Sequence, residues 1–320
     1  MIKGKKKLKE RTVKVFAPAT IANIGPAFDI LGVAIEKPGD YVVAKRTAQP
    51  GLSFEMHSNV IGLPVMEREN VAAFVANRML KEINPTFGVH LTLYKEMPIG
   101  SGLGSSAASS VAAALAVNTL LEKPLSKREL IPFAMEGERK ASGAAHADNA
   151  APALLGGICL VANYLPLDII QLPVKANLIW VVIHPHIIVS TAQARKALPS
   201  SVRLATAVQQ WGKIGGLITG FMSNDVNLIG RSISDHIVEP ARAKLIPGFN
   251  SIKQAALATG ALGCSISGSG PSIFALTTTR AKANRIANAM QMILKRETNF
   301  DCDIYISRTN HRGAHVVKLQ

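Results

Sequence analysis

A glycine-rich segment followed by two serines offers a site for a phosphate group. Glycines occupy positions 100, 102 and 104, and Ser105 and Ser106 follow at the start of an alanine-rich stretch. Backbone N–H groups without a Cβ in the way, at the positive end of a helix dipole, bind phosphate. Both familiar nucleotide motifs are incomplete, because no lysine follows the glycines and the sixth position of G-x-G-x-x-G is Ser105. Close packing of the following helix is an alternative use of these glycines.

Acids, an imidazole and an amide crowd into residues 136–149. Glu138 together with a loop serine would supply the oxygen ligands that Mg²⁺ prefers, with phosphate oxygens and water completing its shell. For Glu136 we favour a solvated helix face, and His146 fits equally well as a histidine satisfied inside the core. Metal or substrate binding is therefore one of two interpretations of this segment.

Two arginines follow small or turn-forming residues. Arg195 comes after Ser190–Ala194, and Arg242 comes after Glu239–Ala241. A guanidinium group binds a carboxylate or phosphate through two parallel hydrogen bonds, although either arginine could instead form a surface ion pair of little worth. A second glycine-rich turn, Ile266–Pro271, could approach a ligand through its backbone or could simply be a tight turn.

The elements that must position these residues alternate between strands and helices. In the first half, apolar periodicity predicts strands Val13–Ala17 and Tyr41–Arg46 around a loop Pro18–Gly39, helix Asn70–Ile83, strand Val89–Leu93 and a helix that is apolar on every face and ends near Leu121. In the second half it predicts strands Leu178–Ile183, Ile273–Thr277 and Asp303–Ser307, and helices Ser251–Thr259 and Arg280–Arg296.

Composition narrows the class of protein. A chain of 320 residues with 48% hydrophobic and 18% charged residues predicts two folded lobes rather than disorder. We find no secretion signal and no membrane span, and three widely spaced cysteines suggest neither disulfides nor a zinc site, so we expect a reducing cytoplasm. The formal charge is +15, but Met1–Arg11 alone contributes +5, and only 5% of residues are aromatic. Nucleic-acid binding is therefore disfavoured.

The order of these motifs resembles that of the GHMP small-molecule kinases over nearly the whole chain. The resemblance also rests on residues 18–29 (Pro-Ala-Thr-x-Ala-Asn-x-Gly-x-x-Phe-Asp) and on Pro98–Ala108, which looks like the family's ATP loop. His146–Pro152 looks like the signature of the branch that phosphorylates L-homoserine, and Ser267–Pro271 looks like the C-terminal glycine motif. An α+β fold of two lobes is implied, with an N-terminal lobe resembling ribosomal protein S5 domain 2, a ferredoxin-like C-terminal lobe, and the active site between them.

The resemblance implies ATP-dependent phosphorylation of the side-chain hydroxyl of L-homoserine to O-phospho-L-homoserine, in threonine biosynthesis. We expect a basic arm at residues 1–11, an ATP-binding lobe at 12–172 and a C-terminal lobe at 173–320. Family members commonly form homodimers, and we expect no nucleic-acid or membrane partner.

Site residues are carried over from the family position by position. Around ATP the resemblance places Asn70, near the adenine, and Pro98, Ile99, Gly100, Ser101, Gly102, Leu103, Gly104, Ser105, Ser106, Ala107 and Ala108. It makes Ser106 and Glu138 the Mg²⁺ ligands. Around the amino-acid substrate it places Asn23, Asp29, His146, Thr191, Arg195, Arg242 and Gly268. A zwitterion needs an anion near its ammonium and a cationic fork near its carboxylate, which this set supplies.

The catalytic group is expected to contain Asn149, Asp29 and Glu138. Related mevalonate kinases are thought to use an aspartate base, whereas the matching position here is Asn149, whose amide is a poor proton acceptor. We therefore predict no dedicated side-chain base, with Asp29 as the reserve candidate. Phosphoryl transfer passes through a loose transition state, so alignment and charge neutralisation can carry most of the rate.

Three other functions compete with this prediction. A kinase for mevalonate or a sugar would need an aspartate base and no paired arginines, which Asn149, Arg195 and Arg242 argue against. An RNA-binding protein that shares the S5-like lobe would be consistent with the basic arm and would bind RNA with a steep salt dependence. A dinucleotide oxidoreductase would need a complete G-x-G-x-x-G followed by an acidic residue about 20 positions later.

Overall fold

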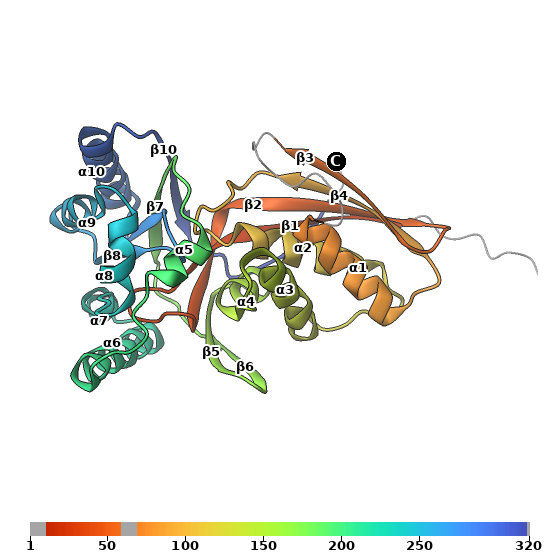
Figure 1. The fold of residues 1–320 in the computed structure, drawn as a ribbon, viewed down its shortest axis with the longest axis horizontal. Coiled ribbons are helices and arrows are strands. Elements are labelled where there is room, and N and C mark those ends of the chain that lie inside the picture. Colours follow the sequence, from red (N-terminus) through yellow and green to blue (C-terminus); the bar gives the residue numbers. More distant parts are fainter. Residues whose placement is uncertain (1–10, 59–68, 319–320) are drawn as a thin grey trace, which may run out of the picture.

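The computed structural model describes residues 11–58 and 69–318, which form two lobes side by side (Figure 1). Except for Arg11, the predicted basic arm lies outside the described residues. The first lobe is built on a sheet whose strands run in the order β11-β1-β2-β4-β3, with a hairpin of β5 and β6 attached to β2. Its strands are β1 (Thr12–Ala22), β2 (Leu31–Thr47), β3 (Leu52–Ser58), β4 (Gly88–Lys95), β5 (Ile158–Tyr164), β6 (Leu167–Leu172) and β11 (His315–Val317).

The loop predicted over residues 18–39 is wrong. Strands β1 and β2 run through it as an antiparallel pair, with Pro18 opposite Gly39 and a shift of register before Thr20. Pro18, Pro38 and Gly39, which look like loop markers, lie at a bulge inside the pair, where a Cβ on Gly39 would lie 2.4 Å from the Phe16 ring. Only residues 23–30 connect the strands. In this short turn Asn23 and Asp29 have φ values of 57° and 60°, a left-handed conformation that Asn and Asp tolerate.

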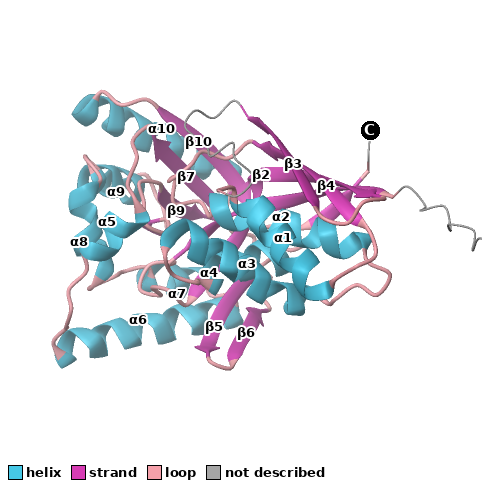
Figure 2. Cartoon of the chain, turned by 45° about the vertical axis from the view of Figure 1, so that its right-hand side comes forward, coloured by secondary structure: helices cyan, strands magenta, loops and turns pink. Residues whose placement is uncertain are grey.

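Four helices cover one face of this sheet (Figure 2). They are α1 (Val71–Ile83), α2 (Ser105–Leu120), α3 (Lys127–Ser142) and α4 (Ala147–Leu155). The helix predicted over 70–83 is confirmed, with Asn70 as the N-cap that accepts a hydrogen bond from the Ala72 amide at 2.9 Å. The prediction of a buried helix after the glycines is also confirmed. In α2 only Ser106 and Thr119 escape full burial, because alanine and serine let α1, α3 and the sheet approach closely.

The second lobe has an antiparallel sheet with the strand order β10-β7-β9-β8. Its strands are β7 (Ile179–Pro185), β8 (Gly263–Ile266), β9 (Ile273–Thr277) and β10 (Cys302–Arg308), and two helices, α9 (Phe249–Ala258) and α10 (Arg280–Thr298), pack on it. Between β7 and β8 lie α5 (Thr191–Lys196), α6 (Leu204–Ser223), α7 (Val226–Ser232), α8 (Val238–Arg242) and a 3-10 turn (Ala243–Leu245). This order of strands and helices is the ferredoxin-like arrangement that was expected.

The five elements predicted in the second half are confirmed, with ends that differ by a few residues. Several elements were not predicted from the sequence, and helix α6, with 20 residues, is the longest of them. It contains Gly212, Gly215, Gly216 and Gly220, which lower helix propensity, and the structure places Gly220 where a Cβ would lie 2.8 Å from the Ile229 amide nitrogen of α7. Tertiary packing against α7 therefore stabilises a helix that local propensity disfavours.

The larger of two hydrophobic clusters contains residues of both lobes, and the smaller one lies within the second lobe. Along β7, Trp180 and Val182 point into the core of the first lobe, whereas Ile179, Val181 and Ile183 lie under α9 and α10. This alternation is the period of a strand that is covered on both faces. The lobes are therefore packed against each other, and the residues between them are held in place from both sides. Within residues 11–58 and 69–318, none of the helices has the length and apolar character that crossing a membrane requires.

Acid conditions are expected to destabilise the second lobe through His184, which is 4% exposed and lies 3.2 Å from the Ser272 hydroxyl. Burial lowers the pKa of His184 to about 4, below its ordinary value of 6.5. As the pH falls, this histidine takes up a proton in the unfolded chain before it does so in the folded chain. The contribution of neutral His184 to the free energy of unfolding is therefore fully present above pH 6.5. It falls as the pH drops from 6.5 to 4, by up to about 3 kcal/mol. Urea unfolding across this range should show the loss in the wild type and a flatter profile in His184→Gln; equal slopes would assign the loss to other groups.

Candidate active site

A cavity of about 710 Å³ lies between the lobes and collects most of the predicted site residues. Its lining includes Asn23, Asp29, Asn70, Ile99, Gly100, Ser101, Gly102, Gly104, Ser105, Ser106, Glu138, His146, Asn149, Thr191, Arg195, Arg242 and Gly268. Four residues of the predicted nucleotide segment do not line it. Leu103, Ala107 and Ala108 are fully buried in the first lobe, and Pro98 precedes the loop.

The glycine loop needs its glycines for conformation and for space. Gly100, Gly102 and Gly104 have φ values of 61°, 75° and 65°, in the left-handed region that favours glycine. A Cβ on Gly102 would lie 2.4 Å from the Ser267 carbonyl oxygen, and one on Gly104 would lie 2.0 Å from the Thr20 hydroxyl. Gly104 is also the N-cap of α2, and no side chain caps this helix. The first amides of α2 therefore face the cavity as phosphate donors.

A serine and a carboxylate from neighbouring helices meet beside this loop. The Ser106 hydroxyl donates to Glu138 Oε1 at 2.5 Å. Gly137 permits this contact, because a Cβ there would lie 2.2 Å from the Ser110 hydroxyl on α2. Burial raises the pKa of Glu138 to about 7, and the Ser106 hydrogen bond and the Lys95 charge oppose the shift. These hard oxygen donors fit Mg²⁺, whose shell phosphate oxygens and water would complete.

A buried ion pair that sequence reasoning missed holds the loop from behind. Lys95 Nζ donates to Asp40 Oδ2, to the Ser105 carbonyl at 2.9 Å and to the Ser109 hydroxyl at 3.0 Å. Asp40 Oδ1 accepts from the backbone amides of Glu96 and Met97 at 3.0 and 3.1 Å. The pair thus ties β2 and β4 to the start of α2. Nothing local in the sequence marks it, because the two residues are 55 positions apart.

The opposite end of the cavity pairs a carboxylate with a guanidinium group. Arg195 Nη2 donates to both oxygens of Asp29, at 3.1 and 2.9 Å, and lies 2.9 Å from His146 Nε2. Burial lowers the pKa of His146, and the charges of Arg195 and Arg242 lower it further against the opposing effect of Asp29. A neutral imidazole whose Nε2 accepts from Arg195 agrees with this geometry. Asn23 fixes the turn, since its Oδ1 accepts from the Asp29 amide at 2.8 Å.

Arg242 reaches the same end of the cavity from α8. It is 2% exposed, and its Nη1 donates to the Gly268 carbonyl at 2.7 Å while its Nε donates to the Ala194 carbonyl at 3.3 Å. Burial lowers the pKa of Arg242 to about 10, which leaves the guanidinium charged at neutral pH. Arg242 is therefore not the surface ion pair that the sequence left open, whereas Arg195 does form an ion pair, with Asp29 on the wall of the cavity. Both converge, with Thr191 at the start of α5, on one place where an anionic group can bind.

Asn149 lies at the start of α4, beside the glycine loop. Its Oδ1 accepts a hydrogen bond from the Thr20 hydroxyl at 2.7 Å. Because this bond occupies the carbonyl oxygen, the amide offers N–H donors to the cavity. A donor at this position orients a ligand and does not remove a proton. Asp148, which sequence reasoning did not single out, also lines the cavity.

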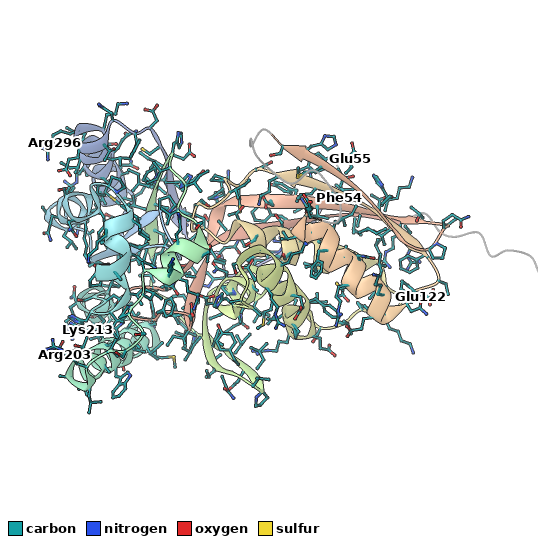
Figure 3. The ribbon with its side chains drawn as sticks, viewed as in Figure 1. Phe54, Glu55, Glu122, Arg203, Lys213 and Arg296 are labelled. Atoms are coloured by element: carbon teal, nitrogen blue, oxygen red, sulfur yellow. The ribbon has the colours of Figure 1, made fainter. Side chains whose placement is uncertain are left out.

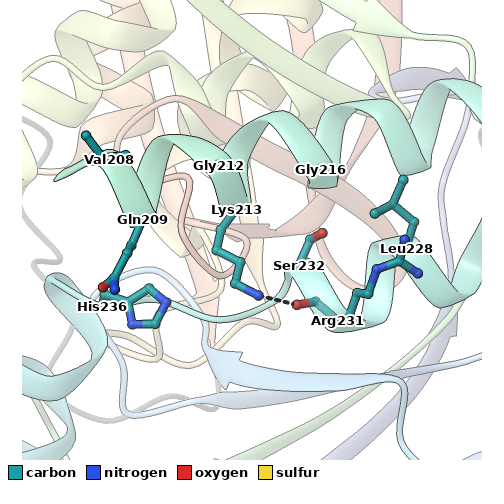
Figure 4. A pocket seen from close by; sticks show the side chains of 9 residues that line it. All are labelled: Val208, Gln209, Gly212, Lys213, Gly216, Leu228, Arg231, Ser232 and His236. Atoms are coloured by element: carbon teal, nitrogen blue, oxygen red, sulfur yellow. Dashed lines mark hydrogen bonds between the residues drawn. The ribbon is translucent and has the colours of Figure 1, made fainter. Parts of the chain in front are cut away.

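A smaller cavity of about 450 Å³ lies on the outer side of the second lobe, between α6 and α7 (Figure 4). Its side chains include Lys213, whose Nζ donates to the Arg231 carbonyl at 2.9 Å, and His236. None of the predicted site residues lines it, so the chemistry of the sequence motifs is confined to the cavity between the lobes.

Comparisons with known proteins agree with this geometry. Residues 70–157 match the model of the GHMP kinases N terminal domain, and residues 217–293 match that of the GHMP kinases C terminal domain. A homoserine kinase of Chlorobium phaeobacteroides strain DSM 266 is 45% identical over 96% of this chain and 100% of its own length. A homoserine kinase of Methanococcus vannielii is 39% identical over 97% of this chain and 100% of its own length.

Solved structures extend the comparison. The crystal structure of homoserine kinase from Cytophaga hutchinsonii matches with a TM-score of 0.90 and 47% identity, over 99% of this chain and 100% of that one. A mevalonate kinase of L. major, solved with R-mevalonate, shares the fold with a TM-score of 0.75 at 16% identity, over 96% of this chain and 98% of that one.

Proposed function

The chain belongs to the homoserine kinase family of the GHMP kinases, and from this premise we propose how its cavity performs the reaction of that family. The reaction is the ATP-dependent phosphorylation of the side-chain hydroxyl of L-homoserine to O-phospho-L-homoserine, in threonine biosynthesis. One observation carries the assignment. A single cavity has a phosphate-binding glycine loop at one end and a group of arginines and a carboxylate that suits an amino acid at the other.

At the nucleotide end, the residues of this chain bind and orient the triphosphate. The amides at the start of α2 and the loop from Gly100 to Ser106 donate to phosphate oxygens, and Asn70 at the start of α1 lies near the adenine. Ser106 and Glu138 would hold Mg²⁺, which neutralises phosphate charge when it is bound. The Asp40–Lys95 pair keeps the loop in register with the sheet.

At the substrate end, the two arginines bind the α-carboxylate of homoserine, with Thr191 and Gly268 beside it. Asn23 and Asp29 face the amine and hydroxyl end, and His146 lies close by. This division follows charge: a carboxylate is stabilised by two fixed guanidinium groups, and an ammonium by carboxylate and carbonyl oxygens. The substrate hydroxyl then faces the phosphate loop from the α4 side of the cavity.

No side chain serves as a dedicated base in this mechanism. Asn149 presents donors, and Asp29 is held by Arg195. The rate comes from alignment of the hydroxyl with the γ-phosphate and from neutralisation of charge, because the transition state is loose and the hydroxyl proton leaves late, to a phosphate oxygen.

The proposed function is tested by the release of ADP from Mg²⁺-ATP with each of five alcohols. We expect turnover with L-homoserine and little or none with L-serine, L-threonine, mevalonate or galactose, because only homoserine combines an α-amino acid group with a hydroxyl at the matching distance. Mass spectrometry of the product should show O-phosphohomoserine. Phosphorylation of another alcohol alone would contradict the assigned substrate end, and absence of all turnover despite ATP binding would contradict the kinase function.

Replacing Asp29 by asparagine distinguishes a role in substrate binding from a role as the catalytic base. We expect Asp29→Asn to raise KM for homoserine much more than it lowers kcat, since the residue binds the substrate and keeps Arg195 in place. Steady-state kinetics at saturating ATP measure both constants. A near-complete loss of kcat at unchanged KM would instead identify Asp29 as a true base.

The remaining expectations stay proposals: a division into 12–172 and 173–320, a homodimer, a cytoplasmic location, and no nucleic-acid or membrane partner. Three unpaired cysteines, Cys159, Cys264 and Cys302, support a reducing compartment. Arg296 and Arg203 lie at opposite ends of the second lobe (Figure 3). Light scattering tests the dimer, and a salt-dependent RNA affinity would contradict the last proposal.

A further inference from the structure

Asp148 has a carboxyl oxygen that no described group satisfies. The residue is 2% exposed and lines the cavity between the lobes, yet its Oδ1 has no hydrogen-bond partner among the described residues. An unpaired buried acceptor costs the free energy of its lost hydration, so native proteins rarely keep one without a use. An oxygen of this kind on the wall of a substrate cavity points to a ligand that donates a hydrogen bond to it.

The surroundings of Asp148 are rich in negative charge. It lies in the first turn of α4, after His146, and faces Asp29 from the β1–β2 turn, Glu138 from α3, the Tyr164 hydroxyl from β5 and Arg242 from α8. Burial raises the pKa of Asp148 to about 8, the charges of Asp29 and Glu138 raise it further, and the backbone amides of Asp148 and Asn149 oppose the shift.

The neighbouring carboxylate is already engaged. Both oxygens of Asp29 accept from Arg195 Nη2, at 3.1 and 2.9 Å. An ammonium group has three N–H donors, and satisfying it inside a cavity requires acceptors beyond one engaged carboxylate. A cation between Asp148 and Asp29 would also stabilise the charged form of both acids, which a neutral hydroxyl cannot do.

We propose that Asp148 is a substrate-binding residue whose Oδ1 accepts a hydrogen bond from the ammonium group of the amino-acid substrate. The inference rests on the proposed function, and it adds a second carboxylate to the amine end, beside Asp29. The arginines then bind the carboxylate of the zwitterion while two acids bind its ammonium, so four charged side chains meet two opposite charges on the substrate.

Binding by this route exchanges a proton for the substrate. Near neutral pH the buried Asp148 carboxyl carries a proton, and the arriving ammonium keeps all three of its own. Formation of the ammonium–carboxylate contact therefore breaks the O–H bond of Asp148 and releases one proton to the solvent, with no change in oxidation state. An analogue without the amine should release none.

The test compares homoserine with 4-hydroxybutanoate, which is the same molecule without its amine. In the wild type we expect kcat/KM to favour homoserine strongly. Asp148→Asn keeps the shape of the side chain but removes its charge, and should lower this preference by about 10–100-fold, the range for one charge-assisted hydrogen bond. Asp168→Asn, an exposed aspartate on β6, is the matched control and should keep the wild-type preference.

Each outcome separates the inference from the function on which it rests. Absence of homoserine phosphorylation by the wild type would overturn the proposed function. If the wild type phosphorylates homoserine and Asp148→Asn keeps the same preference for homoserine over 4-hydroxybutanoate, the proposed role of Asp148 is overturned. It is also overturned if Asp148→Asn changes the Mg²⁺ dependence of the rate instead of this preference.

Calorimetry of the wild type keeps the inference testable if the variant does not fold. Titrations in two buffers with different ionisation enthalpies count the protons released on binding. We expect a fraction of a proton that approaches one below pH 7 with homoserine, and none with 4-hydroxybutanoate. Equal proton counts for both ligands would overturn the inference.

Discussion

Arg242→Ala should reduce kcat/KM for homoserine by about 10³-fold, because removing one partner of a buried charge pair typically costs 2–5 kcal/mol. Arg242 is 2% exposed and is held against the Gly268 and Ala194 carbonyls, so its guanidinium is already oriented before the substrate carboxylate arrives. Its loss also leaves Asp29 and Asp148 with less opposing charge. Steady-state kinetics should show the loss in kcat/KM for homoserine and little change in KM for ATP.

Two comparisons make the Arg242 result specific. With 3-aminopropan-1-ol, which is homoserine without its carboxylate, the wild type and Arg242→Ala should have similar kcat/KM. An equally large loss with this alcohol would show that Arg242 acts through the fold and not through the carboxylate. Arg231→Ala removes an exposed arginine of α7, outside the cavity between the lobes, and should retain wild-type kinetics.

Glu138→Gln is expected to raise the Mg²⁺ concentration at half-maximal rate by at least about 10-fold and to lower kcat by about 10²-fold, since loss of even an outer-shell partner of a metal ligand costs about 10–100-fold. The amide keeps the shape of the side chain and can still accept from Ser106, so the change removes charge and spares packing. Titration of the rate with Mg²⁺ at fixed ATP measures both effects.

The control for Glu138 lies two residues away on the same helix. Glu136 is partly exposed and forms an ion pair with Arg139 at 3.4 Å, which agrees with the solvated helix face predicted for it. Glu136→Gln should therefore leave the Mg²⁺ titration unchanged. An unchanged Mg²⁺ titration in Glu138→Gln would show that Glu138 is not a Mg²⁺ ligand. Ser106 would then be the remaining residue assigned to the metal.

Local chemistry made the glycine loop and the helices α1 and α2 beside it predictable. Positive φ values at the glycines, the N-cap at Asn70 and the buried alanine-rich helix all depend on residues within a few positions of one another. Such features follow from steric limits and helix periodicity, which a single sequence displays directly. The same reasoning failed at residues 18–39, because prolines and glycines mark a bulge within a strand pair as readily as they mark a loop.

By itself, the sequence determined the family resemblance, the two-lobed α+β class and the residue types available for phosphate, carboxylate and ammonium binding. The tertiary structure decided how these groups pair: Arg195 with Asp29 across 166 positions, and Lys95 with Asp40 across 55. It also left Asp148 Oδ1 without a partner within residues 11–58 and 69–318. The free energy of a charged side chain depends on how deeply it is buried and on which groups it pairs with. Both depend on packing between segments that are distant in the chain. For this reason the sequence named the candidate residues, and only the folded chain showed which polar groups have partners among the described residues and which oxygen has none.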